Sequence, residues 1–285
     1  MNKIAIITDS SSNLNFELAE KYDIVIIPYK IQMDGKSYDD LIEIEPEKFY
    51  DCIEEKNLLT GIPSPEECFK VIDDLIEKGI NEIIIFTMAP KLSGMYNLMR
   101  IVKSEYTSKV KIEVIHSDTT AFGTGLLSVY ASELRKEGMD FKSIVDNCKN
   151  KVESKKVGVY ALFRTLKYVI RGGRLNKFKG AIGEFLKIQP IVCMEDGELN
   201  IIEKLRGEKL SRNRLLEIVK NDLKDAKKYY LAFFNAKNND EVIYMKEVLK
   251  DEIQKADKFF DETLTSVLGV HAGPSCIGAA YLIIE

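Results

Sequence analysis

A serine and a glycine stand where the chain turns out of a buried strand. The apolar run Ile83–Met88 predicts a short strand covered on both faces, and Pro90 cannot continue its hydrogen-bond ladder. Ser93 and Gly94 then open an amphipathic helix. Free N–H groups and a hydroxyl at a helix N-terminus can hold an anion, and glycine lets that anion approach the backbone. The simpler alternative is that Ser93 only caps the helix.

One histidine and two basic clusters are the other candidates for chemistry. His271 lies in an apolar, glycine-rich segment, where it is either a satisfied structural residue or a functional one. The first basic cluster accompanies Arg171-Gly-Gly-Arg174, and the second accompanies Lys204-Leu-Arg-Gly207. Runs of charge are usually solvated faces. Two of them beside glycine loops in an acidic chain favour an anionic ligand or partner.

Nucleotide-binding and hydrolase motifs are incomplete. The turn Asp9–Asn13 lacks the glycines of a dinucleotide fold, and Gly35-Lys-Ser37 has Lys30 where a P-loop needs glycine. The segment Gly273-Pro-Ser-Cys-Ile277 misses the last glycine of a nucleophile elbow. A serine hydrolase acting on acyl esters, with Ser93 as nucleophile and His271 as base, stays open as the alternative function.

Composition narrows the class of protein. The chain has 285 residues, 45% of them hydrophobic, and a net charge of −4, which is typical of a soluble globular protein with room for two cores. An acidic chain is not expected to bind nucleic acid. No apolar run approaches the roughly 20 residues of a membrane span.

The termini and the cysteines indicate a cytoplasmic protein. The N-terminus leads directly into a strand without a signal-peptide pattern. Five scattered cysteines without a CxxC motif favour free thiols in a reducing compartment. The cysteines and the two histidines never cluster at ligand spacing, so no metal site is expected.

Strands and helices alternate through the first half of the chain. The patterns predict strands at Ile4–Thr8, Ile24–Ile27, Ile83–Met88 and Val110–Ile115, and helices at Leu14–Lys21, from Pro46, at Pro65–Lys78, from Gly94 to Tyr106, before Lys136 and at Phe141–Val152. Such alternation predicts a parallel sheet with helices on both faces. Ligands bind beyond the carboxyl ends of parallel strands. Asp9–Ser12, Thr87–Gly94 and His116–Asp118 should therefore share one edge.

Two local details follow from the same patterns. Ser12 or Asn13 is the expected cap of the first helix. The helix after Gly94 should turn four residues inward, namely Tyr96, Met99, Ile101 and Val102.

The second half of the chain is less regular. It begins with a predicted strand, Lys156–Phe163, followed by a short helix, Thr165–Ile170, and a further helix near Phe178–Leu186. Hairpin signals at Asp34-Gly35 and Asp196-Gly197 indicate antiparallel pairs, so the second sheet should be mixed. A charged run before Lys156 places the domain boundary there, giving domains 1–155 and 156–285.

Taken in order, four segments resemble the DegV family, the fatty-acid-binding subunits of a fatty acid kinase system. The segments are Lys91-Leu-Ser-Gly94, Val169-Ile-Arg-Gly-Gly-Arg-Leu175, Lys204-Leu-Arg-Gly207 and His271-Ala-Gly-Pro274. The resemblance implies two α/β domains, an N-terminal parallel sheet and a C-terminal mixed sheet, with one long-chain fatty acid such as palmitate buried between them. It implies no other cofactor.

The resemblance also implies residue roles. Thr60 and Ser93 would hold the ligand carboxylate, with His271 in support. Independently of the resemblance, the Gly94 N–H at the helix terminus is a further donor for that carboxylate. Arg174 and Arg206 would serve phosphoryl transfer or docking of the partner kinase. The protein would then be a carrier rather than an enzyme. It would present the carboxylate for acyl phosphate formation and phospholipid synthesis, with transient membrane contact allowed.

The sequence departs from the family pattern at three positions. Gly61 replaces a serine, Met95 replaces a threonine and Ser275 replaces a glycine. These changes leave the preferred acyl chain length and saturation open.

Overall fold

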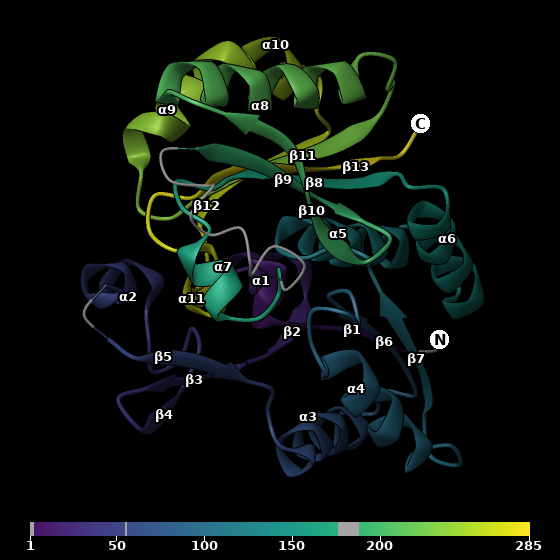
Figure 1. Cartoon of the computed structure of the whole chain (residues 1–285). Helices are drawn as coiled ribbons and strands as arrows, with labels where there is room; N and C mark the ends of the chain where they lie inside the picture. The colour runs from purple at the N-terminus through teal and green to yellow at the C-terminus, as the bar shows by residue number, and fades with distance from the viewer. Residues whose placement is uncertain (1–2, 55, 176–187) are drawn as a thin grey trace.

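One buried helix lies between two β-sheets in the computed structural model, which describes residues 3–54, 56–175 and 188–285 (Figure 1). A third, smaller sheet lies beside them. The predicted α/β class is confirmed. The helix predicted near Phe178–Leu186 lies outside the described residues.

The N-terminal sheet is parallel, as predicted. Its strands are β1 (Ile4–Asp9), β2 (Ile24–Ile27), β6 (Glu82–Thr87) and β7 (Lys111–His116), in the order β2-β1-β6-β7. On one face the core is formed with α3 (Pro65–Glu77) and α4 (Met95–Ser104). On the other face lie α1 (Phe16–Tyr22) and α5 (Phe122–Lys136), with α6 (Phe141–Glu153) packed on α5.

The loops beyond these strands meet at one edge, as expected for parallel strands. The Ser117 N–H donates to the Thr87 carbonyl at 3.0 Å, and the Ala89 N–H donates to the Thr119 carbonyl at 2.8 Å. The 3-10 turn η1 (Ser10–Ser12) continues β1 at the same edge. This edge is where the candidate site is found.

The cap predicted for the first helix was wrong. Asn15 caps α1, because its side chain accepts a hydrogen bond from the Leu18 N–H at 2.8 Å. Asn13 instead ends the preceding 3-10 turn in the left-handed region, with φ 62°. The sequence contains a run of possible caps, and the extra turn shifts the helix start by two residues.

The inward face of α4 was predicted only in part. Met99 and Val102 are fully buried, but Ile101 is 62% exposed and was assigned wrongly. Met95 and Leu98 are buried in its place, since they continue the face of Met99 and Val102 at helical spacing.

The second large sheet is mixed, as predicted. Its strands are β8 (Val157–Leu162), β9 (Gln189–Glu195), β10 (Glu198–Leu205), β11 (Tyr229–Asn235), β12 (Lys258–Thr263) and β13 (Ile277–Ile283), in the order β10-β9-β8-β13-β11-β12. β11 and β12 run parallel, and the other neighbours run antiparallel. Three helices pack on the outer face of this sheet: α8 (Glu208–Leu223), α9 (Asn239–Val248) and α10 (Lys250–Lys255).

Both predicted hairpins are present. Asp34-Gly35 joins β3 (Lys30–Met33) to β4 (Lys36–Asp39), and β5 (Leu58–Gly61) completes the small antiparallel sheet. Asp196-Gly197 joins β9 to β10. Three short helices complete the described elements: α2 (Pro46–Cys52), α7 (Lys167–Arg171) and α11 (Ser266–Ala272). The expected domain boundary at 155/156 falls between α6 and β8, and the two-domain division stays a prediction.

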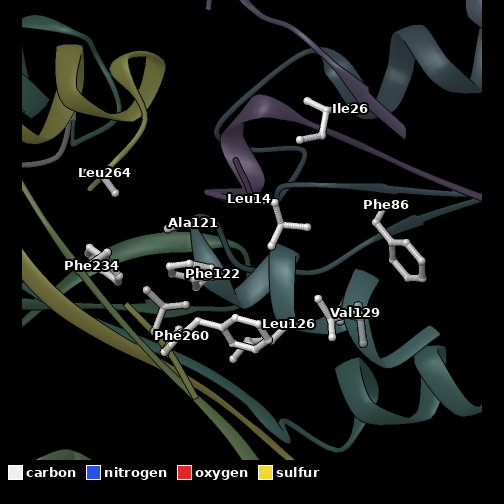
Figure 2. Packing of buried hydrophobic residues seen from close by; sticks show 14 of the residues in the cluster. Leu14, Ile26, Phe86, Ala121, Phe122, Leu126, Val129, Phe234, Phe260 and Leu264 are labelled. Atoms are coloured by element: carbon white, nitrogen blue, oxygen red, sulfur yellow. The ribbon is translucent and has the colours of Figure 1, made fainter. Parts of the chain in front are cut away.

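Helix α5 is enclosed on almost every side. It packs on β1 and β6 of the parallel sheet and on β8, β11 and β13 of the mixed sheet. Figure 2 shows Phe122, Leu126 and Val129 of α5 in one apolar cluster with residues from both halves of the chain, including Phe86 and Phe260. No helix in the described ranges is long and apolar enough to cross a bilayer.

We expect Leu126→Ala to lower the free energy of unfolding by about 2–5 kcal/mol, because truncating a fully buried leucine leaves a cavity. Ile101→Ala in α4 is the control, since an exposed side chain should change stability by no more than about 0.5 kcal/mol. Urea denaturation of the two variants measures both effects. Equal destabilisation by the two substitutions would contradict the central role of α5.

Candidate ligand-binding site

An apolar cavity lies between the mixed sheet and the carboxyl edge of the parallel sheet. About 790 Å³ of space free of protein atoms lies within its outline, part of it open to solvent. Aliphatic, aromatic and sulfur-containing side chains dominate its walls, among them Met88, Val159, Phe163, Val192, Phe234 and Leu268. Such a lining favours a long apolar ligand.

The β9–β10 hairpin forms one wall of this cavity. Met194 and Leu199 line it, and the turn of the hairpin reaches the loop that follows β6. There the Lys91 Nζ donates to the Asp196 carbonyl at 3.0 Å and pairs with the Glu198 carboxylate at 3.0 Å. The hairpin thus connects the mixed sheet with the loop that carries Ser93.

Ser93 is one of the polar residues at the cavity. Its Oγ lies 2.7 Å from the Tyr29 hydroxyl and accepts a hydrogen bond from the Met95 N–H at 3.2 Å. The serine therefore contacts the first turn of α4 and also lines the cavity. The capping and ligand-binding interpretations of Ser93 are compatible in this geometry.

Thr60 and His271 form a second polar pair at the cavity. The Thr60 Oγ1 on β5 lies 2.9 Å from the His271 Nε2 on α11, and both residues line the cavity. The other ring nitrogen, Nδ1, is shielded from solvent and has no hydrogen-bond partner. It packs against Gly172, where a Cβ atom would lie 2.1 Å from Nδ1. Glycine is needed there because any side chain would displace the imidazole.

His271 is neutral at physiological pH. Burial, with smaller contributions from the charges of Arg174 and Arg171, lowers its pKa from 6.5 to about 3. A neutral imidazole carries one N–H and one acceptor nitrogen. His271 can therefore either donate to Thr60 or accept from it.

Arg174 braces the loops on both sides of the site. Its Nε donates to the Leu92 carbonyl at 3.1 Å, and its Nη1 donates to the Gly172 carbonyl at 2.6 Å. The first bond holds the residue before Ser93, and the second holds the glycine behind His271. Among the described residues that line the cavity, Arg174 carries the one permanent charge.

Gly94 and Arg206 lie outside the cavity lining. Gly94 is exposed at the N-cap of α4, with φ −72°, so its backbone conformation does not require glycine. It borders a surface depression together with Arg174. Arg206 is exposed between β10 and α8. The structure thus brings Thr60, Ser93, His271 and Arg174 to one cavity and leaves Arg206 on the surface.

Sequence reasoning missed Tyr29 as a site residue. Tyr29 is 3% exposed and lines the cavity. The signal that could have found it is its position, since it follows β2 at the same carboxyl edge as Ser93.

A buried carboxyl group lies behind Tyr29. Asp9 accepts hydrogen bonds from the N–H and the hydroxyl of Ser11. Burial is the main reason that its pKa rises from 3.8 to about 7, and the nearby Asp40 raises it as well.

The geometry does not pair the residues of the hydrolase alternative. His271 contacts Thr60, whereas Ser93 contacts Tyr29 and the Met95 N–H. A general base works best with a pKa near the working pH, and the pKa of His271 is lowered to about 3. Both observations disfavour a Ser93–His271 catalytic pair.

The model of the DegV family matches residues 3–283 of this sequence. The chain belongs to the DegV family. A DegV domain-containing protein of Caldanaerobacter subterraneus subsp. tengcongensis is 31% identical over 282 residues, covering 99% of both chains. A Thermotoga maritima relative, named a fatty acid-binding protein, is 27% identical over 289 residues and 99% of both chains.

Solved structures of DegV proteins share the fold. A Thermus thermophilus DegV family protein superposes with a TM-score of 0.90 at 22% identity, covering 99% of this chain and all of that one. A fatty acid binding DegV family protein of Streptococcus agalactiae has a TM-score of 0.89 at 25% identity, with complete coverage of both chains. A stearic acid-binding protein of Eubacterium ventriosum has a TM-score of 0.84 at 25% identity, covering 99% of this chain and 98% of that one.

The neutral state of His271 can be tested by NMR. Because the chain has two histidines, His116→Gln leaves His271 as the single imidazole. We expect its ring carbon shifts to stay those of the neutral form from about pH 7.5 down to about pH 4.5, since its pKa is lowered to about 3.

The same shift should appear in the stability of the protein. The unfolded chain takes up a proton at this residue below its ordinary pKa of about 6.5 while the folded chain does not, so His271 lowers stability progressively as pH falls below about 6.5. A ring titration midpoint near 6.5 in the folded protein would contradict the enclosed geometry.

Proposed function

We propose that this DegV protein binds one long-chain fatty acid, such as palmitate, with the acyl chain in the apolar cavity and the carboxylate at Thr60 and Ser93. The observation that carries the proposal is the combination of an apolar cavity with two polar pairs on its wall, Tyr29–Ser93 and Thr60–His271. The names of relatives that bind fatty acids support it.

The apolar walls supply most of the binding free energy in this proposal. Burying about fourteen methylenes at ~0.8 kcal/mol each is worth on the order of 11 kcal/mol before the cost of association. An unpaired carboxylate taken out of water would cancel much of that gain. The head group therefore needs hydrogen-bond donors that are already in place.

Thr60 can be such a donor when His271 donates to it. A threonine hydroxyl has one proton to give. If Nε2 of His271 carries the imidazole proton, it donates to the Thr60 Oγ1, and the Thr60 proton stays free for the carboxylate. Arg174 adds a positive charge at the cavity while it holds the Leu92 and Gly172 carbonyls. The Gly94 N–H follows Ser93 in the loop before α4.

A separate kinase acts on the bound acid in the second half of the proposal. The protein would be a cytoplasmic carrier, not an enzyme, that presents the carboxylate for acyl phosphate formation and phospholipid synthesis. Exchange of the acid would involve transient membrane contact. Arg206 supports the docking role because it is exposed and away from the cavity lining. Arg174 is suited to the transferred phosphate, since a guanidinium binds phosphate oxygens bidentately.

Ser93→Ala should weaken palmitate binding by roughly tenfold, because one donor to a charged group is lost. Ser104→Ala, on the exposed end of the same helix, is the matched control and should bind like the wild type. The chain has no tryptophan, so native mass spectrometry of delipidated protein titrated with palmitate is the measurement. Wild-type protein that takes up no acid would overturn the proposed function.

Arg206→Ala should retain bound palmitate and lose phosphorylation of that palmitate by the partner kinase, because the side chain lies on the surface and not in the cavity wall. Lys78→Ala, at the exposed end of α3, removes a similar charge elsewhere and should leave both properties unchanged. Native mass spectrometry measures retention, and acyl phosphate formation measures the kinase step. Loss of the ligand from Arg206→Ala would show that the two roles are divided wrongly.

A further inference from the structure

Tyr29 lines the cavity next to Ser93. Its main-chain N–H donates to the Ser10 Oγ at 3.1 Å, which fixes it at the edge shared by η1 and α4. Its hydroxyl lies 2.7 Å from the Ser93 Oγ. With 3% of its surface exposed, the side chain has little access to bulk water. The hydroxyls of Tyr29 and Ser93 therefore share one hydrogen bond at the cavity.

The direction of this hydrogen bond decides what Ser93 can offer a ligand. A serine hydroxyl has one proton to donate and two lone pairs that accept. The Met95 N–H already occupies one lone pair, at 3.2 Å. If Tyr29 donates, both lone pairs are used and the Ser93 proton is free for a ligand. If Ser93 donates to Tyr29 instead, its only hydroxyl proton is engaged and it has none to donate to a ligand.

Between the two hydroxyls, acidity favours donation from Tyr29 to Ser93 over the reverse. The Ser11 hydroxyl, which donates to Asp9, is a second neighbour of the phenol. A phenol is a much stronger acid than an alkyl hydroxyl, and it is the weaker acceptor because its lone pairs are partly delocalised into the ring. Tyr29 also keeps its proton: burial, followed by the nearby charge of Asp9, raises its pKa well above 10. The phenol thus stays a donor over the whole physiological range.

We propose that Tyr29 sets the direction of the Ser93 hydrogen bond and thereby makes the site select a carboxylate over an uncharged head group. This inference rests on the proposed function. A carboxylate only accepts hydrogen bonds, so it needs the Ser93 proton. The chain from Tyr29 to Ser93 to the carboxylate then points every donor the same way, and successive bonds strengthen one another. A fatty alcohol can itself donate, so it depends less on that direction.

The Thr60–His271 pair has the same arrangement, a hydroxyl with a possible hydrogen-bond donor beside it. The His271 Nε2 lies 2.9 Å from the Thr60 Oγ1, and in the Nε2–H tautomer of the neutral imidazole it would donate to that hydroxyl. Two hydroxyls on separate elements, β5 and the loop before α4, would then each accept a hydrogen bond from a neighbouring residue. Tyr29 is thus a positioning residue for Ser93, as His271 is for Thr60.

Tyr29→Phe tests the proposal because it removes one oxygen and keeps the ring. Dissociation constants for palmitate and for hexadecanol are measured by native mass spectrometry on delipidated wild-type and variant protein. We expect palmitate binding to weaken by roughly tenfold and hexadecanol binding to change by less than about threefold, so the preference for the acid falls. Tyr38→Phe, on β4 and outside the cavity lining, should preserve both affinities.

A double-mutant cycle separates positioning from folding. In the Ser93→Ala background, Tyr29→Phe should cause no further loss of palmitate affinity, because its effect passes through Ser93. An unchanged acid-to-alcohol preference in Tyr29→Phe would overturn the inference. So would an equal loss of both ligands, or full additivity with Ser93→Ala. Failure of the wild type to bind either ligand would instead refute the proposed function.

Discussion

An anion is stable inside an apolar cavity only where hydrogen-bond donors already face it. In this DegV protein the hydroxyls of Ser93 and Thr60 face the cavity, and each is hydrogen-bonded to a neighbouring residue. Ser93 is hydrogen-bonded to Tyr29 and to the Met95 N–H, and Thr60 is hydrogen-bonded to His271. Arg174 donates to the Leu92 carbonyl beside Ser93 and to the carbonyl of Gly172, the glycine that packs against His271. The surrounding fold is arranged to keep these groups at one place.

The position of α11 shows how the two halves cooperate in this arrangement. The Asn13 side chain accepts from the Thr265 N–H at 2.8 Å, and the Thr265 hydroxyl donates to the Ser10 carbonyl at 2.9 Å. The start of the helix that carries His271 is therefore tied to the turn that also positions Tyr29. A shift of that turn would move the Tyr29–Ser93 and Thr60–His271 pairs together.

Local patterns in the sequence predicted much of the fold. The Ile83–Met88 run and the two glycine hairpin signals each act over a few residues, so the parallel sheet and both hairpins were predicted correctly. Ile101 was misassigned because four apolar residues fitted a helical face only approximately. Asn15 was missed because the 3-10 turn before it leaves no clear periodicity.

The contacts within the site could not be predicted from spacing. Tyr29 and Ser93 are 64 residues apart, and Thr60 and His271 are 211 apart. Which polar groups meet depends on how the sheets pack, and no local pattern specifies that. Family resemblance named Thr60 and Ser93 as carboxylate contacts with His271 in support, but it did not reveal that Tyr29 is hydrogen-bonded to Ser93.

Helix α5 also determines how the chain can be divided. Its residues serve as core for β1 and β6 on one side and for β8, β11 and β13 on the other. A fragment that ends after α6 would keep α5 with an exposed apolar surface. The complementary fragment would lack α5, the helix that packs on the inner face of the mixed sheet. Neither piece has a complete interior of its own, so the halves are expected to behave as one cooperative folding unit rather than as separable modules.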